Sequence, residues 1–593
     1  MSVIILCVII TVALVLFISE WIRLDVVALL IMSGLILTGI LSPVEAIEGF
    51  SNQATVTVLF MFILSASLLK TGALSQVGVF FARMYQKNFT AGLMTMMISI
   101  AIVSAFINNT PIVALFIPII IQTAREAKLS PGKLLMPLSF ASIFGGMCTL
   151  IGTSTNILVD GIARQNGESG FDMFTLTPVG VILSIAGILY MAIIGKKILP
   201  DRENKGKGNY HLHDYLTEIE LFDNARSANK MIREAPLVKE YGMDILEVIR
   251  GNERVSLPSG DFLLKAGDVL KVKCNVERLQ KLKDKLKIRI APTLKVSDHD
   301  FVSKDTSLVE LIITSNSRFD GKTLREVNFR QRYRAIPLAI KHREDIINER
   351  LMNMILKAGD IILVEIKNNR LDKLKEEEYQ QNQPFILLTE RQNIDINWKN
   401  FSIVIACLLG VILLSTLNIL HVLGGTLIAS AVLIVTGCLP VKDIYDVVDW
   451  KVIFLLAGAL SLGMAMEKTG FSTIVANQMI ETVGPWGPIA IISGFYLLTS
   501  ILTEMMSNNA SAALIAPIAI STAHQMEVSA MPFLIAITLA ASASFMTPIG
   551  YQTNTMIYGA GGYQFKDFTR VGFGLNVLFW ILATLLIPLF YEL

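Results

Sequence analysis

The stretch FINNTPIVALFIP, residues 106–118, places two asparagines, a threonine and a proline inside a long apolar segment. A similar stretch, MMSNNASAALIAP, covers residues 505–517. Irregular backbone and polar groups are tolerated at membrane depth only where protein or a water-filled site receives them. The two stretches therefore predict two interrupted membrane segments that are built alike.

Composition indicates a polytopic membrane protein. Of the 593 residues, 53% are hydrophobic and 17% are charged, whereas soluble proteins carry about 25% charged residues. The apolar residues lie in runs of about 17–25, the length that crosses a bilayer. The net charge of +2 is diffuse, which argues against a nucleic-acid partner. The first run, residues 3–18, lacks a basic segment and a cleavage site, so we expect a retained helix rather than a signal peptide.

The apolar runs form two blocks that align with each other at an offset of about 398 residues. Four matches occur in the same order: LTGILSP (37–43) with VTGCLP (435–440), KTG (70–72) with KTG (468–470), NNTPIVALFIP (108–118) with SNNASAALIAP (507–517), and TLIGTSTN (149–156) with TPIGYQTN (547–554). Self-similarity of this kind indicates an internal repeat. We expect each block to hold three spanning helices, a re-entrant hairpin, a broken helix and a last helix.

Such a block crosses the membrane five times, so the second block is inverted relative to the first, as in many secondary transporters. The predicted fold is an all-α polytopic membrane protein of two inverted repeats, residues 1–203 and 396–593, with two small α/β domains inserted between them. Lysine and arginine gather in the connections that an outside N-terminus would place in the cytoplasm, for example Lys196 and Lys197. We therefore expect a cell (inner) membrane protein with both termini outside and the central stretch in the cytoplasm.

The charged central stretch is itself duplicated, as residues 204–295 and 296–395. LLKAGDVLKV (263–272) matches ILKAGDIILV (355–364), and each copy alternates short β-type runs with an intervening helix. Both copies resemble the TrkA-type C-terminal domains of potassium transporters and other carriers, which dimerise and bind small ligands. The resemblance implies a nucleotide or small-metabolite regulator, and the alternative is a tether that only joins the two halves.

The polar residues 108–110 and 507–509, which we call the first and the second tip, have a physical explanation. We expect Thr110 as a helix N-cap with Pro111 at the first helical position, and Asn509 as the N-cap of the second tip. Each helix N-terminus would present free N–H groups and the positive end of a dipole. Gly152 and Gly550 permit backbone bends in a second interrupted segment of each block. No lysine or arginine lies in these four motifs, so a bound anion would need a co-bound cation, which predicts coupled transport.

The tips resemble the Ser-Asn-Thr hairpin signatures of the divalent anion/sodium symporter family, whose members carry sulfate or dicarboxylates with sodium. The resemblance spans both membrane blocks and implies a homodimer, with Na+ as the coupling ion and no organic cofactor. It implies two sodium sites, formed by Ser104, Asn108, Asn109 and Gly152 and by Thr503, Asn508 and Gly550. The substrate, a small divalent anion, would lie between the tips and contact Asn109, Thr110, Thr153, Ser154, Thr155, Asn508, Asn509, Tyr551, Gln552 and Thr553.

Departures from the family pattern bear on the substrate. The tips read Asn-Asn-Thr and Ser-Asn-Asn, and the two prolines usual before the asparagine of each broken helix are replaced by Ser154 and Thr155 and by Gln552 and Thr553. Hydroxyl-rich segments suit a tetrahedral inorganic dianion, so sulfate is our first expectation and a dicarboxylate the second. An anion-binding membrane sensor and a ligand-gated channel are the rival classes.

The chain carries no P-loop, HExxH or G-x-S-x-G motif, so we do not expect an enzyme. Glu504 is an ionisable residue at hairpin depth, and it is either functional or a structural anchor. Lys70 and Lys468 are expected to snorkel at helix ends. The cysteines have no metal-ligand spacing and are expected to be small buried hydrophobes: Cys7, Cys148, Cys274, Cys407 and Cys438.

Overall fold

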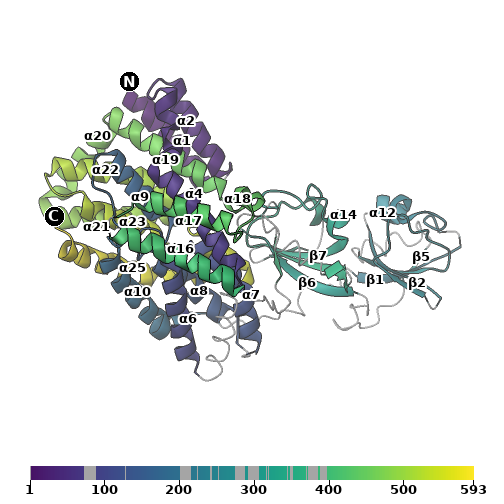
Figure 1. The fold of residues 1–593 in the computed structure, drawn as a ribbon. Coiled ribbons are helices and arrows are strands. Elements are labelled where there is room, and N and C mark those ends of the chain that lie inside the picture. The colour runs from purple at the N-terminus through teal and green to yellow at the C-terminus, as the bar shows by residue number, and fades with distance from the viewer. Residues whose placement is uncertain are drawn as a thin grey trace. The chain divides into compact units, whose positions relative to one another are not determined.

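The computed structural model describes residues 2–19, 21–72, 88–126, 129–200, 216–223, 225–240, 243–251, 253–273, 288–290, 306–314, 317, 319–342, 345–347, 351–368, 370–371, 385–387, 397–417 and 419–592. The chain divides into two units, Met1–Arg202 with Arg391–Leu593 and, separately, Glu203–Glu390. The described part of the first unit is helical, and the second unit holds two β-sheets (Figure 1).

The helices of the first half are α1 (Ser2–Ser19), α2 (Leu24–Leu37), α3 (Pro43–Ile47), η1 (Glu48–Phe50), α4 (Gln53–Lys70), α6 (Phe89–Ser104), α7 (Asn109–Glu126), α8 (Gly132–Gly146), α9 (Ser154–Gln165), α10 (Thr177–Tyr190), the π-helical η2 (Met191–Gly195) and α11 (Lys196–Ile198). Those of the second half are α16 (Trp398–Thr416), α17 (Val422–Val435), α18 (Val441–Val447), α19 (Trp450–Lys468), α20 (Phe471–Val483), η7 (Gly484–Trp486), α21 (Pro488–Met505), α22 (Asn508–Gln525), α23 (Met531–Ser542), α24 (Gln552–Ala560) and α25 (Phe565–Phe590). The described elements follow one order in both halves: α1–α4 correspond to α16–α19, and α6–α10 to α21–α25.

Helix length and apolar character suit a membrane. Among the described residues, seven helical segments are long and apolar enough to cross one: Ser2–Ser19, Pro43–Lys70, Thr177–Ile198, Trp398–Thr416, Trp450–Lys468, Pro488–Met505 and Phe565–Phe590. Large apolar side chains such as Leu413 and Leu585 point outward, whereas α8 and α23 are buried along almost their whole length. These long apolar helices agree with the prediction of a mostly helical polytopic protein.

The predicted interruptions are confirmed, but the helices begin earlier than expected. The α7 helix begins at Asn109, and Asn108 Oδ1 accepts a hydrogen bond from Thr110 N at 3.4 Å. The α22 helix begins at Asn508 with Ser507 as its N-cap. The predicted N-caps, Thr110 and Asn509, are therefore wrong by two residues, because several consecutive side chains in each tip are able to cap and the first of them does so.

The two KTG lysines join the two halves. Lys468 Nζ lies 2.8 Å from Glu45 Oε1, and Lys70 Nζ pairs with Asp443 Oδ2. Glu45 and Asp443 lie on the short helices α3 and α18, at equivalent positions of the repeat. Both lysines are the last residues of their helices, where snorkelling was expected, and each also has an acidic partner in the opposite half that was not predicted.

The second unit contains two five-stranded sheets with strand orders β3-β2-β4-β1-β5 and β10-β6-β9-β7-β8. Their strands are β1 (Leu216–Leu221), β2 (Asp244–Arg250), β3 (Glu253–Ser256), β4 (Val269–Lys273), β5 (Ile288–Ile290), β6 (Thr306–Ile312), β7 (Ala335–His342), β8 (Asp345–Ile347), β9 (Ile361–Lys367) and β10 (Ile386–Leu387). All pairs are antiparallel, and read from the opposite edge the second order is the first with five added to each number. Short helices lie between the strands: η4 (Ile232–Glu234), α12 (Pro236–Lys239), α14 (Phe329–Tyr333) and η6 (Leu351–Asn353).

Each sheet has one buried aspartate in the Gly-Asp turn before its central strand. Asp268 Oδ1 accepts from Arg250 Nε at 2.7 Å, and Asp360 Oδ1 lies 2.8 Å from His342 Nδ1 at the equivalent place. Both carboxylates also accept a backbone N–H from three residues earlier. Burial raises the pKa of Asp360 to about 6. The two copies thus share one turn but differ in the basic partner of its aspartate.

Candidate functional site

Four helices begin at the predicted motifs: α7 at Asn109, α9 at Ser154, α22 at Asn508 and α24 at Gln552. The first tip contacts the broken helix of the second half. Thr110 Oγ1 donates to Gln552 Oε1 at 2.9 Å, and Asn109 Nδ2 donates to Tyr551 Oη at 2.5 Å. Helix N-termini carry unpaired N–H groups and a partial positive charge, so this meeting point favours negative charge.

The second tip makes the equivalent contact with the broken helix of the first half. Asn509 Oδ1 accepts from Thr155 Oγ1 at 2.8 Å, and Asn509 Nδ2 donates to Ser154 Oγ at 3.2 Å. Thr110 and Asn509 hold the same position in the repeat, as do Ser154 and Gln552. The structure thus gathers the tips and the broken helices into one polar cluster, in which α22 packs on α9 and α24 packs on α7.

Two asparagines hold the breaks of the broken helices. Asn156 Nδ2 donates to the carbonyl oxygens ten and seven residues earlier, at 2.9 and 2.8 Å. Asn554 makes the same two bonds in the second half, at 3.0 and 3.3 Å. Both asparagines are fully buried, so they satisfy carbonyl groups that the interrupted helix leaves unpaired. Both residues lie within the repeated motifs of the sequence, but no role was expected for either of them.

Ser139, on α8, is a further residue that sequence analysis missed. Its fully buried hydroxyl lies 2.7 Å from both Thr553 Oγ1 and Asn554 Oδ1, so it ties one broken helix to the other. The equivalent position of the second half is Ile537, and no repeated pattern therefore marks Ser139. Thr553 is also fully buried. Its hydroxyl contacts Ser139 on α8, so it lies behind the side chains that form the polar cluster.

The residues expected to form the first sodium site lie close together in the structure, with the exception of Asn108. Ser104, the last residue of α6, donates its hydroxyl to Asn109 Oδ1. A Cβ on Gly152 would lie 2.6 Å from the carbonyl oxygen of Gly146 and 3.1 Å from that of Ala105. Only glycine allows this close approach, which brings helix-end carbonyl oxygens beside the hydroxyl and the amide. Oxygen atoms of these kinds suit a hard cation.

The second expected set repeats this geometry. Thr503 Oγ1 donates to Asn508 Oδ1 at 3.0 Å, as Ser104 does to Asn109. A Cβ on Gly550 would overlap the Ser544 hydroxyl and would lie 2.6 Å from the carbonyl oxygen of Thr503. The residues of both sets therefore fit a sodium ion by the chemistry of their donor atoms.

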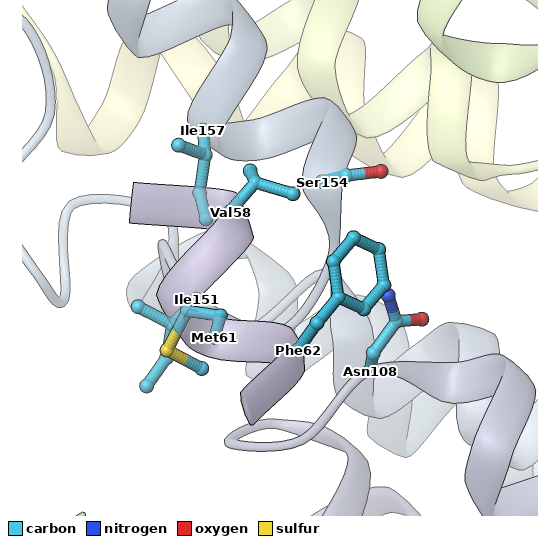
Figure 2. Close-up of a pocket in the computed structure, with 7 residues that line it drawn as sticks. All are labelled: Val58, Met61, Phe62, Asn108, Ile151, Ser154 and Ile157. Atoms are coloured by element: carbon cyan, nitrogen blue, oxygen red, sulfur yellow. The ribbon is translucent and has the colours of Figure 1, made fainter. Parts of the chain in front are cut away.

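Asn108 lies in the wall of a small pocket beside the first tip (Figure 2). The pocket is lined by Val58, Met61, Phe62, Asn108, Ile151, Ser154 and Ile157. Three of these residues come from α4, and Ser154 belongs to the polar cluster. The pocket therefore adjoins the cluster on a largely apolar side.

Glu504, in the last turn of α21, is held against the break that follows α23. Its carboxylate oxygens accept five hydrogen bonds, from Phe545 N (2.8 Å), Met546 N (2.9 Å), Thr547 N (2.9 Å), Ser544 Oγ (3.1 Å) and Asn576 Nδ2 (2.9 Å). Successive backbone N–H groups of this kind form an anion-binding concavity. The contacts favour the structural-anchor interpretation of Glu504. The first half has Ala105 at the equivalent position.

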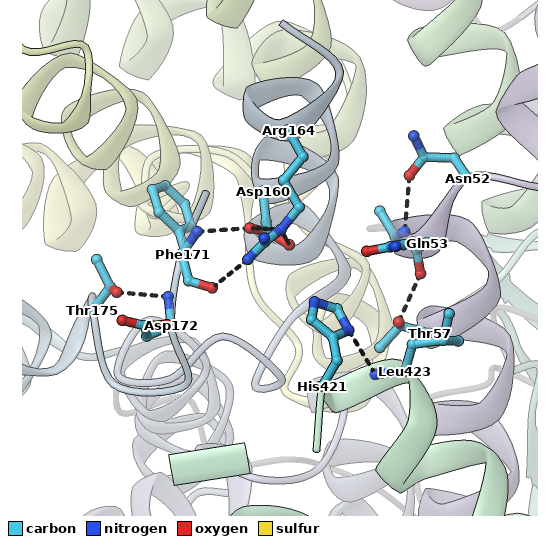
Figure 3. A network of polar contacts seen from close by, with 11 residues as sticks. Asn52, Gln53, Thr57, Asp160, Arg164, Phe171, Asp172, Thr175, His421 and Leu423 are labelled. Atoms are coloured by element: carbon cyan, nitrogen blue, oxygen red, sulfur yellow. Dashed lines mark hydrogen bonds and ion pairs between the residues drawn. The ribbon is translucent and has the colours of Figure 1, made fainter. Parts of the chain in front are cut away.

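A separate polar network lies toward the C-terminal end of α9 (Figure 3). Arg164 Nε donates to both oxygens of Asp160, at 3.0 and 3.1 Å, and Phe171 N donates to Asp160 Oδ1 at 2.6 Å. Nearby, His421 caps α17 by accepting from Leu423 N at 3.3 Å. The network fixes the chain that follows α9 and contains none of the predicted site residues.

Comparisons with known proteins supply the family context. The family model described as "Citrate transporter" matches residues 14–532. "Uncharacterized transporter sll0640" of Synechocystis is 37% identical and covers 98% of this chain and 95% of its own. "Uncharacterized transporter YfbS" of Escherichia coli is 27% identical and covers 98% of both chains. "Sodium/sulfate cotransporter 1" of Chlamydomonas reinhardtii is 22% identical and covers 92% of this chain and 84% of its own.

Proposed function

Because the chain belongs to the citrate transporter family, we propose that it carries a small divalent anion together with sodium across the membrane by alternating access. The family is one of transporters, and the apolar helices are consistent with a multi-pass membrane protein.

One observation supports anion transport above the others: four helix N-termini meet in a cluster of amides and hydroxyls. Backbone N–H groups and aligned dipoles bind anions at such places. The motifs that form the cluster contain no lysine or arginine, so positive charge for a dianion has to come from elsewhere. Sodium at the Ser104–Asn109 and Thr503–Asn508 pairs would supply that charge and would couple the two fluxes.

Sulfate is the proposed cargo, and a dicarboxylate is the alternative. The hydroxyl groups of Thr110, Ser154 and Thr155 face the opposite half within the cluster, and hydroxyl donors suit the oxygens of a compact tetrahedral dianion. The similarity to a sodium/sulfate cotransporter over 92% of this chain supports the same choice. The family description, a citrate transporter, supports the alternative.

Alternating access would follow from the repeat. We propose that the two halves are inverted copies, with both termini outside and residues 204–395 in the cytoplasm. The support is the common helix order of the halves, the paired tip contacts and the lysine and arginine distribution. Two inverted copies can exchange conformations, so that the cluster opens first to one side and then to the other.

The central unit would regulate the carrier. We propose two TrkA-type C-terminal domains that bind a nucleotide or a small metabolite within a homodimer. The shared strand order of the two sheets supports a duplicated module. A ligand changes the transport rate only if it binds the inward-open and outward-open states with different affinity.

Counterflow in proteoliposomes tests the proposed function. Vesicles with purified protein are loaded with unlabelled sulfate and sodium, then diluted into trace labelled sulfate. A carrier accumulates label transiently, a channel equilibrates it without overshoot, and a sensor moves none. Lack of overshoot with both sulfate and dicarboxylates would contradict the proposal.

A further inference from the structure

Besides Ser154 and Gln552, the two broken helices differ beside the tips at the position that Thr153 and Tyr551 occupy. Thr153 and Tyr551 both precede the first helical residue, and both have an extended backbone, with φ and ψ of −146° and 150° and of −129° and 135°. Their side chains therefore start from equivalent places in the two halves. The threonine is small, whereas the tyrosine adds an aromatic ring to the second half only.

The ring of Tyr551 reaches across the cluster. Its Oη accepts from Asn109 Nδ2 at 2.5 Å and lies 3.4 Å from Thr153 Oγ1. The side chain is 7% exposed, so the ring fills the space between the first tip and both broken helices. Asn508, the equivalent of Asn109, is half-buried and accepts a hydrogen bond from Thr503 within its own half.

We propose that Tyr551 is a specificity-determining residue whose ring shortens the substrate site. The ring takes up space that the smaller threonine leaves open at the equivalent place of the first half, so it would favour a compact dianion such as sulfate. A dicarboxylate of four or more carbons has two charged ends farther apart, and its chain would overlap the ring. This inference rests on the proposed function and names the substrate class of the same site.

The ring and the hydroxyl have separate roles. The Tyr551 hydroxyl accepts from Asn109, so its own hydrogen is free to donate to a bound oxyanion or to the more distant Thr153 Oγ1. The ring supplies volume, and the hydroxyl supplies one hydrogen bond. Tyr551→Phe removes only the hydroxyl, whereas Tyr551→Thr installs the residue that the first half has at this position.

The experiment measures substrate preference in proteoliposomes with a sodium gradient. Labelled sulfate uptake is inhibited by unlabelled sulfate or by unlabelled succinate, and the ratio of the two inhibition constants is the readout. We expect Tyr551→Thr to shift this ratio toward succinate by about tenfold or more, the scale of a changed pocket contact, and to take up labelled succinate. Tyr551→Phe should keep the wild-type ratio, and Tyr551→Leu should lie between the two variants.

The controls separate this inference from the proposed function. If wild type moves neither anion with sodium, the proposed function fails before the variants are compared. If wild type moves sulfate but Tyr551→Thr and Tyr551→Leu keep its preference, the size role is overturned. A wild type that already prefers succinate, or an equal shift in Tyr551→Phe, overturns it as well. Should Tyr551→Thr fail to fold, the order of Tyr, Phe and Leu still decides the matter.

Discussion

Replacing the Glu504 carboxylate tests whether this residue anchors the second broken helix. Glu504→Gln keeps the size of the side chain but removes one acceptor oxygen. If the amide oxygen takes the place of Oε1, it can still accept from Phe545 N, Met546 N and Asn576 Nδ2. The amide nitrogen then faces Thr547 N, another donor, whereas the Ser544 hydroxyl can rotate and accept.

The magnitude follows from these five contacts. One buried backbone N–H left without an acceptor costs about 1–3 kcal/mol. Three hydrogen bonds that change from charged to neutral acceptors lose about 1 kcal/mol each. We therefore expect Glu504→Gln to lower the free energy of unfolding by about 4–6 kcal/mol, and Glu504→Ala to lower it further because all five donors lose their acceptor.

Thermal unfolding in detergent measures the effect. A thiol-reactive dye reports unfolding when the buried Cys148 and Cys438 become exposed. The midpoint of Glu504→Gln should fall by about 5 °C or more, while Glu481→Gln, at an exposed position on α20, should leave it unchanged. A Glu504→Gln midpoint equal to that of wild type would show that the carboxylate does not anchor the second broken helix.

Four further outcomes are expected. Asn109→Ala and Asn508→Ala should each abolish sodium-driven uptake while the protein stays folded and membrane-inserted, and normal uptake by both variants would rule out the site. Gly550→Ala should raise the sodium concentration that gives half-maximal uptake, because the new Cβ would lie 2.6 Å from a carbonyl oxygen of α21. If this sodium concentration is unchanged, that oxygen is not a sodium ligand. The raised pKa of Asp360 means that the folded state binds a proton more tightly than the unfolded state. The free energy of unfolding should therefore fall by up to about 3 kcal/mol as the pH rises from 4 to 7. Unfolding measured across this pH range should show the fall in wild type but not in Asp360→Asn. Replacing residues 208–392 by a flexible linker should remove any response of uptake to nucleotides. If the intact protein responds to no nucleotide in a panel, and the shortened protein transports equally well, the central unit is only a tether.

The interruptions and the helix order could be predicted from the sequence because their signals are local. Asparagine, threonine and glycine stand out within apolar segments, and the same pattern returns about 398 residues later. The N-caps could not be predicted to the residue, because Asn108, Thr110, Ser507 and Asn509 are all types that cap helices well. Only the backbone geometry selects one of them.

The partners across the halves could not be predicted for a different reason. Asn109 and Tyr551 lie 442 residues apart, as do Thr110 and Gln552, and Lys70 lies 373 residues from Asp443. Nothing in either local stretch specifies such a partner, since any amide, hydroxyl or acid at that depth could satisfy the same polar group. Packing of the helices decides which of them meet.

We propose that a sodium gradient drives a divalent anion through the cluster between the tips. The most direct measurement is sulfate accumulation in proteoliposomes with an inward sodium gradient, compared with an equal potassium gradient and with a proton gradient alone. Accumulation above the external concentration with sodium only, rising sigmoidally with sodium as two sites require, is the predicted result. Equal accumulation without sodium, or accumulation driven by protons alone, would contradict it.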